Sequence, residues 1–146
     1  MQLTQFTDYS LRLLIYLALS PEGATISEVA ERFGISRNHL TRIAHDLGRK
    51  GWIVTTRGRG GGLKLARPAA EINIGKVVQS VEPNFHIVEC FDRDHNACVI
   101  TGACALKGAL HAATRAFFDE LERHTLADVI ANQQPLRLSL QMKPGG

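Results

Sequence analysis

The chain has 146 residues, a net charge of +3 and 45% hydrophobic residues, values typical of a globular protein with either one domain and its core or a small domain with an appendage. No apolar run reaches the roughly 18–20 residues that span a bilayer, and the first ten residues lack the basic start and apolar segment of a secretory signal. We therefore expect a cytoplasmic protein with no membrane partner, in which cysteines serve as metal ligands or sensors rather than in disulfides.

Three helices are predicted in the first fifty residues. The apolar stretch "FTDYSLRLLIYLALS" predicts a helix over about residues 6–20, ended by Pro21. In "TISEVAERFG", Thr25 and Glu28 have the spacing of a capping box, in which each side chain binds a free backbone N–H of the other residue. A second helix is therefore expected to begin there and to end at Gly34.

The third predicted helix, "RNHLTRIAHDLGRKG", has one apolar and one polar face. Ser36 can cap its start, and a tight turn joins it to the second helix, a pattern that indicates a helix-turn-helix. The start of the second helix of such a motif meets base edges in the major groove, where Arg can bind guanine and Asn adenine. An ordinary helical hairpin with a solvated face is the alternative. The residues expected to contact DNA here are Ser36, Arg37, Asn38, His39 and Arg42.

The segment "WIVTTRGRGGGLKLARP" predicts two strands joined by a glycine-rich turn. Arg57 and Arg59 lie in that turn, where a backbone without side chains allows a close approach to phosphate or the minor groove. A nucleotide-phosphate loop is disfavoured because no Lys-Ser/Thr pair follows the glycines. Residues 37–67 contain eight basic residues and one acidic residue, Asp46, which suggests a polyanion partner, with a solvated basic face as an equal alternative on charge alone. The predicted unit is a winged helix that binds double-stranded DNA.

The second half of the chain predicts two further helices. "INIGKVVQSVE" is a short apolar helix that we expect to pack on the first unit. "ALKGALHAATRAFFDELERH" is a long helix with a narrow apolar seam, for which a second copy of the chain is the expected cover and the chain's own domain the alternative. The last residues, from "QQPLRL" on, have no readable pattern, and their end is expected to be disordered. The predicted dimerisation seam comprises Leu106, Leu110, Ala113, Phe117 and Leu121.

These elements predict a mainly α fold with a small β-hairpin wing. We divide the chain into a winged helix-turn-helix domain (1–82), a cysteine loop (83–104) and a dimerisation helix with a C-terminal tail (105–146).

All three cysteines lie in "CFDRDHNACVITGAC": Cys90, Cys98 and Cys104. The tight pairs of zinc sites are absent, and wider spacing favours an iron–sulfur cluster, with a thiol switch as the alternative. Cys104 precedes the long helix, whose positive end stabilises thiolate. Such clusters usually have four protein ligands, and spacing alone does not choose among the candidates for the fourth: Glu89, Asp92, Asp94 and His95.

The stretches "LTQFTDYSLRLLIYLA", "GISRNHLTRI", "RGRGGGLKLA", "INIGKVV", "CVITGAC" and "HTLADVI" together resemble the iron–sulfur winged-helix regulators over nearly the whole chain. The resemblance is strongest to the nitric-oxide-sensing repressors of the NsrR type. The related IscR type has a histidine ligand where this chain has Lys107.

The resemblance implies that the fourth ligand is Asp8 of the partner subunit. Arg12, one helical turn further on, can orient Asp8. It also implies a 4Fe–4S cluster, with 2Fe–2S as the alternative, nitric oxide as the signal and release of operator DNA as the response. The competing hypothesis is a thiol- or cluster-based redox protein, such as a cluster carrier, without sequence-specific DNA binding. No set of residues typical of a catalytic site was found, so we expect no enzyme.

Overall fold

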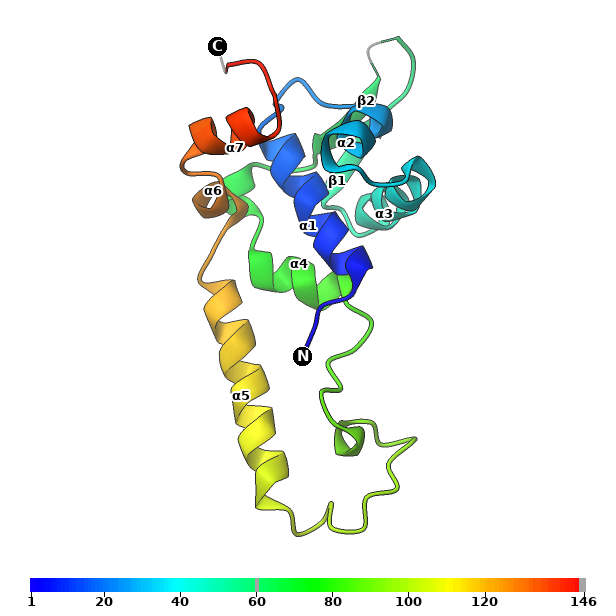
Figure 1. Ribbon diagram of the computed structural model, residues 1–146, viewed down its shortest axis with the longest axis vertical. Coiled ribbons are helices and arrows are strands. Elements are labelled where there is room, and N and C mark those ends of the chain that lie inside the picture. Colours follow the sequence, from blue (N-terminus) through cyan, green and yellow to red (C-terminus); the bar gives the residue numbers. More distant parts are fainter. Residues whose placement is uncertain (60, 145–146) are drawn as a thin grey trace.

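Helix α1 (Gln5–Ala18) runs through the middle of the folded body (Figure 1). The computed structural model describes residues 1–59 and 61–144. One face of α1 is fully buried through Leu13, Leu14 and Leu17. The helix ends two residues before the predicted Ser20, because the Leu19 and Ser20 amides bond to nearby carbonyl groups and tighten the chain into a turn.

Helices α2 (Ile26–Phe33) and α3 (Arg37–Arg49) form the predicted helix-turn-helix. Both hydrogen bonds of the Thr25–Glu28 capping box are present, and Gly34 ends α2 with φ of 64°, in the left-handed region that favours glycine. The predicted apolar face of α3 is confirmed, since Leu40, Ile43, Ala44 and Leu47 are all buried.

Strands β1 (Ile53–Thr56) and β2 (Gly62–Leu65) form the predicted antiparallel wing, paired from Ile53–Leu65 to Thr56–Gly62. The wing is joined to the body because Ala24 and Leu63 exchange two backbone hydrogen bonds. This contact requires glycine at position 62, where a Cβ atom would lie 2.7 Å from the Ala24 carbonyl oxygen.

Helix α4 (Ile74–Val81) follows the short 3-10 helix η1 (Ala69–Glu71) and closes the core below α1. Its apolar residues are buried, as predicted. The mainly α fold with a small hairpin wing is thus confirmed.

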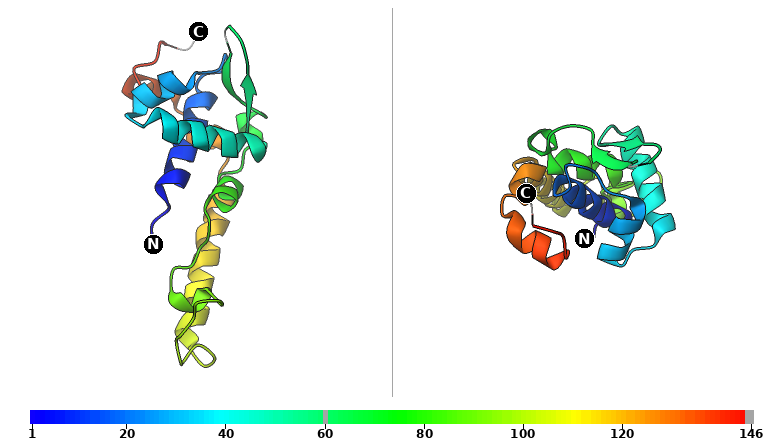
Figure 2. Two further views of the ribbon diagram at one scale, coloured as in Figure 1. Left: turned by 90° about the vertical axis from the view of Figure 1, so that its right-hand side faces the viewer. Right: turned by 90° about the horizontal axis from the view of Figure 1, so that it is seen from above.

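Helix α5 (Ala105–Glu122) extends away from the body as an arm (Figures 1 and 2). The cysteine loop, which contains the 3-10 helix η2 (Glu89–Phe91), leads from α4 out to the tip of this arm, and α5 returns from the tip to the body (Figure 1). Phe85 packs edge-on against Phe118, with ring centroids 4.4 Å apart, and Phe91 stacks on His111 at 3.9 Å. These aromatic contacts place the loop against α5.

Part of the C-terminal segment in which the sequence has no readable pattern is helical. Helices α6 (Leu126–Val129) and α7 (Gln133–Ser139) pack beside α1, and Leu126, Ile130 and Leu140 belong to the core. Pro135 fits in the first turn of α7, where backbone N–H groups have no partner within the helix. The predicted disordered end, residues 145–146, lies outside the described residues. Within the described part of the chain, no helix is both long enough and apolar enough to cross a membrane.

Candidate nucleic-acid interface and metal-binding loop

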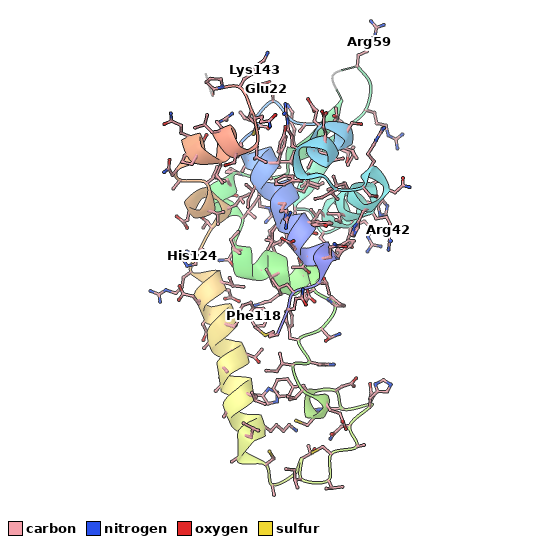
Figure 3. The ribbon with its side chains drawn as sticks, viewed as in Figure 1. Glu22, Arg42, Arg59, Phe118, His124 and Lys143 are labelled. Carbon is pink, nitrogen blue, oxygen red and sulfur yellow. The ribbon has the colours of Figure 1, made fainter. Side chains whose placement is uncertain are left out.

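The outer face of α3 presents basic side chains to solvent. Arg37, Asn38 and Arg42 are exposed, and Arg42 points away from the body (Figure 3). Asp46, the acidic residue of this stretch, is paired with Arg49 at 3.2 Å and Lys50 at 2.5 Å. The face therefore carries a net positive charge toward an approaching ligand.

Two residues of the predicted DNA set also have roles inside the protein. The Ser36 hydroxyl caps α3 by accepting a hydrogen bond from the His39 amide at 3.1 Å. The His39 ring packs against Tyr9 of α1, with centroids 5.2 Å apart, and lies 6.2 Å from the Phe6 ring. His39 thus connects the start of α3 to the start of α1.

The wing extends beside this face and carries Arg57 and Arg59, both exposed, with Arg59 at its tip (Figure 3). A third arginine of this region, Arg67, contacts the protein itself and not solvent alone. The Arg67 guanidinium lies 5.3 Å from the centre of the Trp52 ring and donates to the Gly51 carbonyl, which holds it against the body. Arg57 and Arg59 are therefore two wing cations available to a partner.

Asp8 and Arg12 form a two-bond ion pair near the start of α1. Arg12 Nη2 lies 2.7 Å from Asp8 Oδ2, and Arg12 Nε lies 3.1 Å from Asp8 Oδ1. Both side chains are close to half exposed. The Arg12 guanidinium also lies 5.3 Å from the centre of the Tyr9 ring. The predicted pairing of Arg12 with Asp8 is present within one chain.

All three cysteines are free thiols in the segment from η2 to the start of α5, and this segment lies at the end of the arm away from α6 and α7 (Figure 1). Cys90 lies in η2, Cys98 is exposed in the loop, and Cys104 is the N-cap residue of α5 without a side-chain capping bond. No three His, Cys, Asp or Glu side chains converge into a metal-binding group among the described residues. The chain folds the three cysteines into one loop but does not gather their sulfur atoms into a site.

The other acidic candidates in the loop have partners of their own. A Glu89 carboxylate oxygen accepts a hydrogen bond from the Ala97 amide at 2.5 Å. Asp92 lies 2.9 Å from His95 Nδ1, and this hydrogen bond lowers the pKa of the Asp92 carboxyl. Asp94 is exposed. Glu89, Asp92 and His95 thus shape the loop, which leaves them less available as ligands than a free side chain.

The donor set suits iron–sulfur chemistry. Three free thiols on one connecting segment supply the soft ligands that such clusters require. Cys104 lies at the N-terminal end of an 18-residue helix, whose partial positive charge stabilises thiolate and an anionic cluster.

Helix α5 has no buried residue over its 18 residues. Of the predicted seam, Leu106 is 64% exposed and Ala113 is exposed, whereas Leu110 and Phe117 are half-buried. Leu121 packs against the chain's own core. At this residue the seam is covered by the chain's own domain, which is the alternative given for it above. The C-terminal end of α5 is therefore covered by its own domain, whereas the side chains nearer its N-terminal end face solvent or a partner.

Sequence reasoning missed one set of contacts around Glu82. Its carboxylate accepts hydrogen bonds from the Thr4 amide, the Thr4 hydroxyl and the Thr7 hydroxyl. These residues are 75 to 78 positions apart in the chain, so no local pattern could have indicated the contact.

Comparison with known proteins places this geometry in a family. The family model of Rrf2, the iron-dependent transcriptional regulators, matches residues 3–132. The chain is 50% identical to the HTH-type transcriptional regulator NsrR of Shouchella clausii, over 98% of this chain and 97% of that protein. It is 47% identical to the NsrR of Halalkalibacterium halodurans, over 99% and 100%.

A solved structure shares the fold. The IscR of T. potens superposes with a TM-score of 0.74 at 22% identity, over 99% of this chain and 94% of that one. The relatives are named as regulators of transcription, a role without catalysis. The chain belongs to the Rrf2 family of iron-dependent transcriptional regulators.

Proposed function

We propose that this protein is a dimeric, cytoplasmic repressor that binds operator DNA and responds to nitric oxide through an iron–sulfur cluster. Cys90, Cys98 and Cys104 would hold the cluster together with Asp8 of the partner subunit. The observation that carries the proposal is the combination of an exposed basic winged helix with three free thiols on an arm of the same chain.

The proposed DNA contacts divide by chemistry. Arg37, Asn38 and Arg42 are exposed at the start and on the outer face of α3, where a recognition helix reads base edges or phosphates. Arg57 and Arg59 would contact the backbone or the minor groove. Ser36 and His39 would act at the same surface mainly by fixing the start of α3, given their contacts within the protein.

The proposed cluster is of the 4Fe–4S type, and when bound it supplies iron that reacts with nitric oxide. Asp8 would be the single oxygen donor beside three soft thiolates, and therefore the ligand most easily displaced. Arg12 is positioned to receive the released carboxylate, because the Asp8–Arg12 pair is fully formed in the structure. That pair stabilises the carboxylate outside the site.

A continuous set of contacts supports coupling between Asp8 and the DNA-binding face. Arg12 binds Asp8 and lies over the Tyr9 ring, and Tyr9 packs edge-on against His39 in the first turn of α3. A change in the position of Asp8 would therefore reach α3 through directly touching side chains.

The proposed dimer forms through α5. Leu106 and Ala113 of α5 are exposed to water unless a partner covers them. A second α5 is the partner that suits a twofold protein on a twofold operator.

Anaerobic purification followed by native mass spectrometry and iron and sulfide analysis tests the cluster. We expect a dimer whose mass includes an iron–sulfur cluster per chain in wild-type protein, and none in Cys98→Ser. Because Cys98 is exposed and makes no core contact, that variant should keep the wild-type far-UV spectrum. A wild-type protein without iron and sulfide would contradict the proposal.

The rival hypothesis of a redox protein is tested by binding to duplex DNA. A repressor should prefer one site strongly and lose affinity steeply as salt rises, since it neutralises phosphates. Equal affinity for all duplexes would favour the rival.

A further inference from the structure

The start of α1 is held by a single carboxylate from another part of the chain. Glu82 Oε2 accepts hydrogen bonds from the Thr4 amide at 3.0 Å, the Thr4 hydroxyl at 3.0 Å and the Thr7 hydroxyl at 2.5 Å. Thr7 is completely buried. Within residues 1–59 and 61–144 this carboxylate forms no ion pair with a Lys, Arg or His side chain, so neutral donors and the N-terminal end of α1 stabilise its charge.

The contact fixes the turn that carries Asp8. Thr4 is the N-cap of α1, its hydroxyl accepts from the Thr7 amide, and its carbonyl oxygen accepts from the Asp8 amide at 3.0 Å. Glu82 thus holds both the cap residue and the residue immediately before Asp8. A shift of the Glu82 carboxylate would move the backbone of Asp8 with it.

Glu82 is also the point at which the cysteine loop leaves the body. It is the C-cap residue of α4, with its amide bonded to the Val78 carbonyl, and Pro83 follows directly. Two residues further on, Phe85 is fixed against Phe118 of α5. The residue that holds the start of α1 is therefore joined by a short, anchored segment to the loop that carries Cys90.

We propose that Glu82 is a positioning residue that sets where Asp8 is presented to the cluster and links it to the chain's own cysteine loop. This inference rests on the proposed function, in which Asp8 serves the partner's cysteines. In the dimer each Glu82 would then contact elements of two sites, the helix start offered to one cluster and the loop that binds the other. Glu82 would make each site sensitive to the state of its neighbour.

The test compares substitutions that remove the contact with matched ones that keep it. Glu82→Ala removes the carboxylate, and Thr7→Val removes one donor while preserving side-chain shape. Thr7→Ser keeps the hydroxyl and serves as the rescue. Glu71→Ala removes an exposed carboxylate from η1 and serves as the control. Asp8→Ala is the reference for loss of the ligand.

Three quantities are measured on the full-length protein. Visible circular dichroism of the anaerobic holoprotein reports the ligand environment, and stopped-flow absorbance gives the rate of reaction with nitric oxide. Amide hydrogen exchange over residues 4–9 of the cluster-free protein reports the order of the helix start without any cluster.

We expect Glu82→Ala and Thr7→Val to shift the visible spectrum in the same direction as Asp8→Ala does. Both variants should also change the rate of reaction with nitric oxide about tenfold, which is the lower end of the effects seen when residues that orient metal ligands are replaced. Exchange over residues 4–9 should be faster in both variants. Thr7→Ser and the control should match wild type. Adding Glu82→Ala to Asp8→Ala should produce no further change in rate, because Glu82 acts through Asp8.

Wild-type spectra and rates in Glu82→Ala and Thr7→Val, beside an altered Asp8→Ala, would overturn this inference and leave the proposed function standing. An additive effect in the double variant would also overturn it, since that shows a general structural role. A wild-type spectrum in Asp8→Ala would instead remove Asp8 from the site and overturn both. If Glu82→Ala does not fold, the Thr7→Val and Thr7→Ser pair decides.

Discussion

The contact between α4 and α5 gives the sharpest test of how the arm is attached to the body. Gly75 is buried in the first turn of α4, where a Cβ atom would lie 2.9 Å from the Glu122 nitrogen and 3.1 Å from its Cα. These are backbone atoms, which cannot rotate away. Gly75→Ala must therefore push α5 outward, and it would also strain the hydrogen bonds that Asn73 and Gln79 donate to Glu122.

The expected cost follows from two opposed effects. Overpacking of this kind costs about 1–3 kcal/mol. The higher helix propensity of alanine offsets this by up to about 1 kcal/mol. The net loss lies within about 0–3 kcal/mol, and its middle value of about 1–2 kcal/mol should lower the midpoint of thermal unfolding by about 2–8 °C in a protein of this size.

Far-UV circular dichroism of the cluster-free protein measures this midpoint. Protein concentration must be held constant, because the unfolding temperature of a dimer depends on it. Gly48→Ala in α3 is the matched control, since a Cβ atom there would have no neighbour within 4 Å and the substitution should not destabilise the protein. A Gly75→Ala protein that melts at or above the wild-type temperature would refute the proposed close contact.

Three further predictions concern assembly, DNA binding and pH. Leu106→Glu on α5 should convert the dimer to monomer in sedimentation velocity without loss of helicity. Leu138→Glu, at a similarly exposed leucine of α7, should remain dimeric, and the same oligomeric state in both variants would argue against an α5 interface. Arg57→Ala should weaken operator binding and reduce the slope of log affinity against log salt by about 1, the change expected for one lost phosphate contact; an unchanged slope would place Arg57 off the DNA. Hydrogen bonds from the Thr125 amide and hydroxyl lower the pKa of Asp128, so its capping contribution is present at neutral pH and is lost as pH falls through the lowered pKa. When pH is lowered, the NMR chemical shift of the Thr125 amide should therefore change with a midpoint below the ordinary pKa of an aspartate. A midpoint above that pKa would contradict the capping geometry.

Local patterns predicted most of the body correctly. The Thr25–Glu28 capping box and the stop at Gly34 depend on residues a few positions apart, so the sequence contains the whole signal. The hairpin was predictable for the same reason, because its two β-prone runs flank a glycine-rich turn. Helix α7 was missed because its first turn contains Pro135 and no capping side chain, although Leu136 and Leu140 are spaced for one helical face.

The parts that could not be predicted depend on contacts between distant segments. Nothing near Glu82 indicates that it binds Thr4 and Thr7, and the close approach at Gly75 is visible only once α5 is in place. The cysteine loop is a different case. Its residues indicate the chemistry, but the resemblance to a family, not the spacing, points to Asp8 as the fourth ligand.

Whether the cluster controls DNA binding is decided by the operator affinity of one anaerobic preparation before and after a stoichiometric titration with nitric oxide, with the visible spectrum recorded on the same samples. We expect tight, site-selective binding at the start and a loss of affinity that follows the bleaching of the cluster absorbance. Affinity that stays constant while the cluster absorbance disappears would contradict it.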